Sequence, residues 1–375
     1  MSKRFLSLLS LSALTLVACE GGGDSGPIKI GFLGPLTGDA APYGVDTLNG
    51  VKLAVDEINA VGGVKGRMIE LIAEDSRCTG ADAASAAQKL VNVDKVVAIV
   101  GGQCSGETLA AAPIAEAAGV VMVSPISSSP DVTNAGDFVF RDYPSDALKT
   151  KAMAAYLREE GLTKLAMISE NTDFAQTFRA SLKKDFGEEN IVFDEVVEPG
   201  TKDYRTLATR LKDVDFNIFF PNAQTDAAIA AMMQQIREQG LEQQAISHDV
   251  ADSVTLGELA PEAVEGMYIV NVPTAGEGGD FQTKFDQKFG GAQATIAFAA
   301  HAYDAMGVIG KAIEAAGANG AAIKDYLYSM PAYKGVVGEF TFDRNGDVVG
   351  LSYALKIFKD GKIEKVKDIA VNSML

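Results

Sequence analysis

A single unit recurs along this chain: a short apolar run, a loop of glycine, proline, serine or asparagine, and a segment whose apolar residues fall every three to four positions. The first copy consists of the run 28–33, the loop 34–38 and the helical pattern 45–59. Further apolar runs stand at residues 96–100, 120–123, 165–168, 217–220 and 244–247. Alternating strands and helices predict α/β architecture, with parallel sheets that helices cover on both faces.

The length and the end of the chain refine this prediction. At 375 residues the chain exceeds what one simple core organises, which favours two lobes, joined near residues 141–146. Near the end, the run 338–342, the polar stretch 343–347 and the run 351–358 predict a hairpin on an Asn-Gly turn. The polar stretch has the acidic spacing of a calcium loop, but Val348 stands where such a loop needs glycine, so we predict no metal there.

The N-terminus has the features of an export signal. Lys3 and Arg4 precede an apolar run, 5–18, which is too short to span a bilayer and ends in small residues before Cys19. This ending resembles the lipobox of bacterial lipoproteins, which implies a signal peptide at 1–18, a lipid-modified Cys19 and a flexible tether over 19–26. The alternative is an ordinary secretory leader. Both predict a periplasmic or cell-surface protein, and the first adds a lipid anchor.

Charge and hydropathy exclude other classes. A formal net charge of −17 argues against nucleic-acid binding, which needs clustered lysine and arginine. After the leader, no run of about 18 apolar residues predicts a membrane-spanning helix. The membrane is therefore expected as a partner only through lipid.

Cys78 and Cys104 are the only thiols that remain after export, apart from the predicted lipid-modified Cys19. An oxidising compartment favours their pairing, and the bond would close a loop of 25 residues, for about 3 kcal/mol of stability. Two free buried thiols are the alternative. With only His248 and His301 as further soft ligands, and no tight spacing among the four, we predict neither a metal site nor a cofactor.

Serine-rich loops at the carboxyl ends of two strands are the candidate ligand site. Ser105 follows the run 96–100, and Ser127, Ser128 and Ser129 follow the run 120–123. Ligands of open parallel sheets lie beyond these ends, where serine hydroxyls and helix N-terminal N–H groups suit a carboxylate. Serine is also the common helix cap, so each loop alone has a structural alternative. Asp249, after the run 244–247, is a candidate for an ammonium group.

Several motifs together are similar to those of the type I periplasmic binding proteins of branched-chain amino acid ABC transporters, the leucine/isoleucine/valine-binding group. The similarity extends from about residue 28 to 358. The motifs are GPLTG at 34–38, YG at 43–44, DEIN at 56–59, GG at 62–63, EDSRC at 74–78, GGQCS at 101–105, SP at 124–125, EGM at 265–267 and AYDA at 302–305.

The resemblance implies two Rossmann-like lobes that three hinge crossovers join: lobe 1 at 27–143 with about 274–340, and lobe 2 at 144–273 with about 341–375. It implies a monomer that captures an amino acid, branched-chain or related, for an ABC permease. It also places the family disulfide on Cys78 and Cys104.

The resemblance further implies roles for eight residues. Ser105 and Ser128 would hold the ligand carboxylate, Ser127 would offer a backbone carbonyl to the ammonium, and Asp249 would pair with that ammonium. Tyr43, Phe174 and Phe298 would form apolar walls. Gln224 stands where the family has a tyrosine pair, and it would suit a ligand other than plain leucine.

Two other classes remain as alternatives. A ligand sensor that signals to a partner would use the same two lobes. An exported serine hydrolase would need a base, but the chain has no Gly-x-Ser-x-Gly elbow, and both histidines are poor triad candidates. We therefore predict no catalytic residues and no enzyme.

Overall fold

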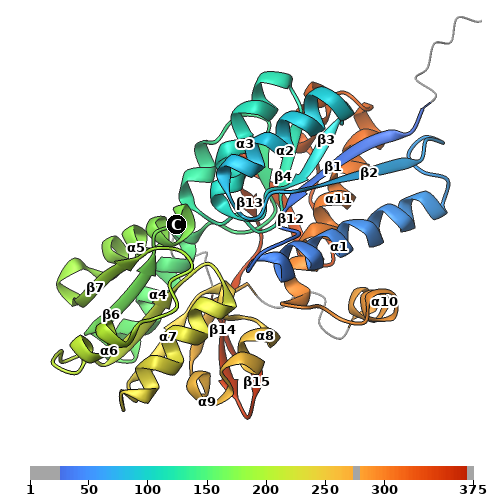
Figure 1. Cartoon of the computed structure of the whole chain (residues 1–375). Coiled ribbons are helices and arrows are strands. Elements are labelled where there is room, and N and C mark those ends of the chain that lie inside the picture. The colour runs from blue at the N-terminus through green and yellow to red at the C-terminus, as the bar shows by residue number, and fades with distance from the viewer. Residues whose placement is uncertain (1–25, 273–278, 370–375) are drawn as a thin grey trace, which may run out of the picture.

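The computed structural model describes residues 26–272 and 279–369, which form two α/β lobes (Figure 1). Lobe 1 has a parallel five-stranded sheet in the order β2-β1-β3-β4-β5. Its first part consists of β1 (Ile28–Gly34), α1 (Ala41–Ala60), β2 (Ile69–Asp75), α2 (Gly80–Lys89), a π-helix (Leu90–Asp94), β3 (Ala98–Gly101), α3 (Ser105–Ala118), β4 (Val121–Ser124), a 3-10 helix (Pro130–Asn134) and β5 (Val139–Arg141).

Lobe 2 has a seven-stranded sheet in the order β15-β14-β10-β9-β8-β6-β7, in which β14 runs antiparallel to both its neighbours. Its first part consists of α4 (Asp146–Glu159), β6 (Leu165–Glu170), α5 (Asp173–Phe186), β7 (Ile191–Val197), α6 (Arg205–Leu211), β8 (Ile218–Asn222), α7 (Asp226–Glu238), β9 (Gln244–Ser247), α8 (Val254–Leu259), α9 (Pro261–Val264) and β10 (Tyr268–Asn271), with 3-10 helices at Glu188–Asn190 and Asp249–Ala251.

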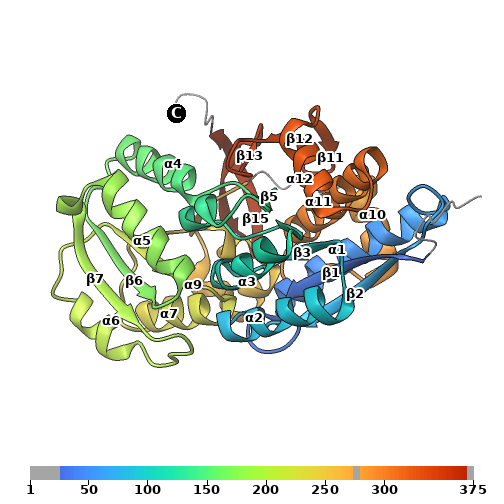
Figure 2. The ribbon, with the colours of Figure 1, turned by 90° about the horizontal axis from the view of Figure 1, so that it is seen from above.

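The chain then returns to each lobe once more. Lobe 1 gains α10 (Asp280–Phe289), α11 (Ile296–Ala316), α12 (Gly320–Ser329) and a small sheet of β11 (Tyr333–Gly335), β12 (Gly338–Phe342) and β13 (Val348–Val349). Lobe 2 gains β14 (Tyr353–Lys359) and β15 (Lys362–Ile369). The crossovers lie between β5 and α4, between β10 and α10, and between β13 and β14, so the predicted fold with three crossovers is confirmed. Figure 2 shows the two lobes side by side, seen from above.

The third crossover lies later than predicted. We placed the return to lobe 2 at about residue 341, but β12 stays in lobe 1 because it pairs with β11 and, through Phe342 and Val348, with β13. The predicted hairpin of 338–342 with 351–358 is therefore wrong in its second strand. The chain leaves lobe 1 at Gly350, whose φ of 110° suits glycine. Strand β14 then pairs with β10 and β15 in lobe 2.

The parallel sheet of lobe 1 has a core on both faces. In β1, Ile28, Ile30 and Phe32 pack in one cluster with α1 and α11, whereas Leu33 packs in another with α2 and α3. Helices α1 and α11 lie so close that a Cβ on Gly50 would come within 2.1 Å of the carbonyl oxygen of Ala299. This packing holds the carboxyl ends of β1 and β3 at one edge of lobe 1.

Polar contacts tie the crossovers together. Arg141, at the end of β5, is buried, forms an ion pair with Asp347 at 2.6 Å and donates to the carbonyl of Ser129 at 2.7 Å. Across the other crossovers, Tyr143 donates to Oδ1 of Asn271 at 2.6 Å, and Tyr353 donates to the carbonyl of Ser145 at 2.7 Å. The hinge therefore also positions the serine loop that follows β4.

The predicted signal peptide and lipid-modified Cys19 lie outside the described residues, as does the tether except for Gly26. Among the helices that the structure does describe, none has the length and apolar character needed to cross a bilayer.

Candidate functional site

A cleft between the lobes brings together seven of the eight predicted ligand-binding residues. It encloses about 420 Å³, open solvent at its mouth included. Its lining consists of Tyr43, Gln103, Cys104, Ser105, Ile126, Ser128, Phe174, Gln224, Asp249, Val250 and Phe298. Ser127 is the predicted residue that the lining lacks, and Gln103, Ile126 and Val250 are lining residues that sequence reasoning did not select.

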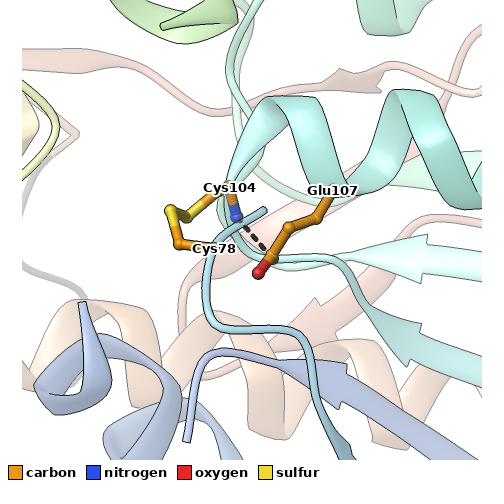
Figure 3. Close-up of side chains that lie close together, drawn as sticks. All are labelled: Cys78, Cys104 and Glu107. Carbon is orange, nitrogen blue, oxygen red and sulfur yellow. Dashed lines mark hydrogen bonds between the residues drawn. A yellow bond between two sulfur atoms is a disulfide. The ribbon is translucent and has the colours of Figure 1, made fainter. Parts of the chain in front are cut away.

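The N-terminus of α3 forms the lobe 1 side of the cleft. Cys104 is its N-cap, and Oε2 of Glu107 accepts hydrogen bonds from the amides of Gln103 at 2.8 Å and Cys104 at 2.9 Å (Figure 3). Burial raises the pKa of Glu107 to about 7, against the opposing effect of a hydrogen bond from Ser76. This carboxyl group fixes the loop that presents Ser105, the first residue of the helix, to the cleft.

The serine loop after β4 divides its hydroxyl groups between structure and site. The Ser127 hydroxyl lies 2.6 Å from that of Thr108 and 3.1 Å from the carbonyl oxygen of Gly102, so it ties the two loops behind the cleft. Its carbonyl oxygen, predicted to meet a ligand ammonium, accepts a hydrogen bond from Arg141 at 3.4 Å. Because Ser127 lies outside the cleft lining, its contact with a ligand stays a prediction. The neighbouring Ile126 lines the cleft and adds an apolar side chain to its wall.

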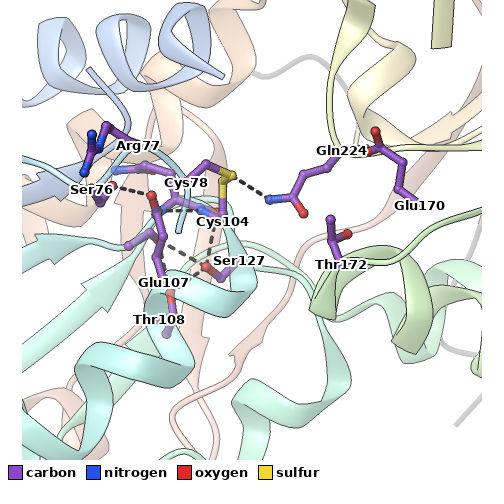
Figure 4. The surroundings of a disulfide bond; sticks show 12 residues. Ser76, Arg77, Cys78, Cys104, Glu107, Thr108, Ser127, Glu170, Thr172 and Gln224 are labelled. Atoms are coloured by element: carbon purple, nitrogen blue, oxygen red, sulfur yellow. Dashed lines mark hydrogen bonds between the residues drawn. A yellow bond between two sulfur atoms is a disulfide. The ribbon is translucent and has the colours of Figure 1, made fainter. Parts of the chain in front are cut away.

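The predicted disulfide between Cys78 and Cys104 is present, with Cα atoms 5.5 Å apart. It lies where the lobes meet, because Nε2 of Gln224 donates to Sγ of Cys78 at 2.7 Å (Figure 4). Cys78, Cys104 and Glu107 bring possible metal-ligand atoms within 4.8 Å of one another. The sulfur atoms are joined to each other, however, and a metal site would need thiolates, so this cluster does not fit a metal ion.

Asp249 forms the charged side of the cleft in lobe 2, and sequence reasoning missed its partner. Lys149, on α4, is fully buried, and its Nζ lies 2.8 Å from Oδ1 of Asp249 and 2.8 Å from Oδ1 of Asp146. Ser128 of lobe 1 donates its hydroxyl hydrogen to Oδ2 of Asp146 at 2.8 Å. The spacing of Asp146 and Lys149, three residues apart on one helix, is a sequence signal that predicts their ion pair. No such signal predicts the ion pair of Lys149 with Asp249, because the two residues lie on distant segments of the chain.

This ion network settles the charge on Asp249. Burial by itself would raise the pKa of Asp249, but the attraction of Lys149 outweighs it, and the pKa lies below its ordinary value. Burial would lower the pKa of Lys149, but the two carboxyl groups raise it. For Asp146 burial prevails, and the pKa is raised. The network thus holds an ionised Asp249 at the cleft and contains one more acidic group than basic groups.

His248 is a packing residue beside this network. Burial lowers its pKa to about 3, which keeps the ring neutral, and its Nε2 lies 3.2 Å from Oδ1 of Asn222. The ring meets Phe174 edge to face, with centroids 4.8 Å apart. A neutral imidazole with so low a pKa is a poor general base, which argues against the hydrolase alternative.

Aromatic rings form the apolar walls. Tyr43 and Phe298 of lobe 1 lie with ring centroids 5.8 Å apart, and Phe174 faces them from α5 of lobe 2. The Tyr43 hydroxyl accepts a hydrogen bond from the amide of Asp226 at 3.1 Å, so this residue also joins the lobes. A cleft whose apolar walls enclose hydroxyl groups and a carboxylate suits a small molecule with both polar and apolar parts.

These features define a bilobed binding protein, in which a small ligand is enclosed between two α/β lobes. A family model described as periplasmic binding protein matches residues 27–362, and the chain belongs to that family. The family predicted from the sequence motifs is thereby confirmed.

Named relatives and solved structures agree. The Leu/Ile/Val-binding protein of Escherichia coli K12 is 29% identical over 250 residues, a match that spans 64% of this chain and 66% of that protein, just under two thirds of its length. An amino acid binding protein of Pseudomonas aeruginosa is 27% identical over 355 residues, 89% of this chain and 90% of the relative. The crystal structure of LivJ from Streptococcus pneumoniae, in complex with isoleucine, superposes with a TM-score of 0.84 at 29% identity, covering 92% of this chain and 99% of that one.

Proposed function

We propose that this protein is the extracytoplasmic solute-binding component of an ABC transporter, which captures an amino acid as a monomer and delivers it to the permease. One observation carries the proposal: an ionised Asp249 from lobe 2 and the Ser105 end of α3 from lobe 1 line the same apolar-walled cleft. An α-amino acid presents an ammonium and a carboxylate one carbon apart, and these two sides match its two charges.

The carboxylate binds at the N-terminus of α3. The first N–H groups of a helix lack partners within the helix, and the helix dipole favours a negative charge there. The hydroxyl oxygen of Ser105 accepts a hydrogen bond from the amide of Ser129 at 3.2 Å, which leaves its own hydrogen for the ligand. Ser128 contributes less than the family resemblance implies, because its hydrogen is donated to Asp146.

The ammonium binds to the ionised carboxylate of Asp249, which Lys149 holds in its charged form. Closure of the lobes excludes water, so these contacts act at a lower effective dielectric than in solution. Hydrogen bonds from the Asp226 amide to Tyr43 and from Thr177 to Ser129 also join the two lobes. Ligand therefore joins the lobes by placing its ammonium against the ionised carboxylate of lobe 2 and its carboxylate against the helix N-terminus of lobe 1.

Delivery requires that the protein work outside the cytoplasm, near its permease. The leader that ends at Cys19 supports export and a lipid anchor, and the relatives named above support the amino acid and the transporter. Mass analysis of membrane-extracted protein tests the anchor by the acyl mass at Cys19. An unmodified mature chain would contradict the anchor and leave the binding proposal intact.

Isothermal calorimetry of the mature protein against the common amino acids tests the binding function. Removing one partner of a buried charge pair costs about 2–5 kcal/mol, so Asp249→Ala should weaken binding roughly 30-fold or more. Ser105→Ala should cost less, because the helix N–H groups remain. Asp215→Ala is the matched control, since Asp215 is exposed on lobe 2 with 85% of its side-chain surface accessible. Unchanged affinity in Asp249→Ala would contradict the ammonium site.

A further inference from the structure

Gln103 places an unsatisfied hydrogen-bond acceptor beside the cleft. The residue lies between β3 and α3, lines the cleft and is only 4% exposed. Its Nε2 donates to the carbonyl oxygen of Leu33 at 3.4 Å, whereas its Oε1 is buried and has no hydrogen-bond partner among the described residues. An unpaired buried acceptor of this kind is unusual, because it forfeits its hydrogen bond with water.

The surroundings of Gln103 fix which end of its amide is free. The nitrogen faces Leu33, because an oxygen there would lie against another carbonyl oxygen. The backbone is held at both ends: its N–H donates to Glu107 at 2.8 Å, and its carbonyl accepts from the Ser127 hydroxyl at 3.2 Å. Gly34 makes room for the side chain, since a Cβ there would lie 2.7 Å from Cγ of Gln103. The local structure is thus built to hold this side chain, with Oε1 as its one unused polar atom.

A second amide in the cleft lining presents the same chemistry from lobe 2. Nε2 of Gln224 donates to Sγ of Cys78, and Figure 4 shows its amide oxygen turned away from the disulfide. Two glutamines from opposite lobes thus donate their amide N–H groups to protein atoms, and their amide oxygens remain as acceptors for a ligand. Asp249 is the only charged residue in the described lining, and the ligand ammonium uses it, so no further acid remains there to balance a cationic side chain.

We propose that the ligand is an amino acid with a neutral side chain that carries an O–H or N–H donor, a hydroxyl or a primary amide, and that Oε1 of Gln103 accepts its hydrogen bond. The inference rests on the proposed function, since it assumes that the α-carboxylate and the ammonium bind as described above. A purely aliphatic side chain would leave Oε1 without a partner, whereas a side chain with a donor would supply the missing hydrogen bond. Sites built to hydrogen-bond a ligand group discriminate strongly against analogues that lack the group.

Calorimetry with two near-isosteric ligand pairs, threonine with valine and asparagine with leucine, tests the proposal. In each pair the members have similar shape, and one has the donor. We expect at least one donor-bearing member to bind the parent protein about tenfold or more tightly than its aliphatic partner. Gln103→Leu, which keeps the volume and removes the acceptor, should abolish or invert that preference.

Gln243→Leu is the matched control, because Oε1 of Gln243 is also buried without a partner but the residue lies outside the cleft lining. It should leave the ligand preference unchanged. Tighter binding of valine and leucine by the parent, or an unchanged preference in Gln103→Leu, would overturn the proposal while preserving amino acid binding. Failure of every amino acid to bind would instead contradict the proposed function itself.

Discussion

Lys149→Met should convert the charged side of the cleft into a pair of carboxyl groups that compete for a proton. In the parent, Asp146 and Asp249 both lie 2.8 Å from the Lys149 ammonium, and all three side chains are essentially inaccessible to solvent. Methionine keeps most of the side-chain volume and removes the cation. Removing one partner of a buried ion pair costs about 3–5 kcal/mol, so the free energy of unfolding should fall by an amount in this range.

The pH dependence of binding separates an electrostatic role from a merely structural one. The lowered pKa of Asp249 gives a stabilisation that is present above 3.8 and lost only as pH falls through its folded value. The raised pKa of Lys149 gives a stabilisation that is present below 10.5 and lost as pH rises through its folded value. Neither changes between pH 6 and 8. Without Lys149, burial and the neighbouring Asp146 both raise the pKa of Asp249, and the pair retains a proton in this window.

Calorimetric titrations of the best amino acid ligand at pH 6, 7 and 8 measure the effect. In Lys149→Met the ligand affinity should fall as pH falls, by up to about tenfold per pH unit. This pH dependence should be steeper than that of the parent, in which only Asp146 has a raised carboxyl pKa within the network. Lys356→Met is the control, because Lys356 is buried and pairs with Asp252 at 2.5 Å, outside the cleft lining. Its loss should destabilise lobe 2 without changing the pH dependence of ligand affinity. Equal slopes in parent and Lys149→Met, with equal stability, would refute the reasoning.

Two further predictions concern stability. Replacing Cys78 and Cys104 together by alanine opens a loop with a sequence separation of 26, so urea unfolding should show a loss of roughly 3 kcal/mol; an unchanged midpoint would contradict this. Burial raises the pKa of Glu107 from 4.5 to about 7. The protonated carboxyl group therefore contributes to the free energy of unfolding below pH 4.5, and this contribution is lost as pH rises through 7. The parent should therefore lose roughly 2–3 kcal/mol more than Glu107→Gln between pH 5 and 8; parallel unfolding curves for the two proteins would exclude that assignment.

The sequence predicted the parts of the site that depend on local order along a strand and its following loop. Ser105 and Asp249 follow β3 and β9, and parallel strands bring such positions to one edge of each sheet. Tyr43, Phe174, Gln224 and Phe298 came from the family resemblance, and the structure places all four in the lining. Ser127 could not be separated from Ser128 by sequence, because neighbouring residues of an irregular loop follow no fixed alternation of direction.

The parts that were missed depend on contacts between distant segments. The pairing of β14 with β10 rather than with β12 is decided by burial within the lobe 2 sheet, where Tyr353, Ala354 and Leu355 are all buried. A hairpin prediction from a turn motif considers only the nearest partner. Gln103 belongs to the motif GGQCS at 101–105, and nothing in the sequence indicates that its side-chain oxygen lacks a partner.

Lys149 shows why the charged residues of such a site escape sequence reasoning, and it also constrains how the site works. It lies on α4, immediately after the first crossover, and both its carboxyl partners belong to lobe 2. Both ion pairs of the network therefore lie within lobe 2, and Ser128 of lobe 1 adds a hydrogen bond to Asp146. Asp249 is held in its ionised form by its own lobe, so it presents the same charge before and after closure. In the proposed binding mode, closure is stabilised by a ligand whose ammonium meets Asp249 while its carboxylate meets α3, and a molecule that lacks either group would leave one lobe without its contact.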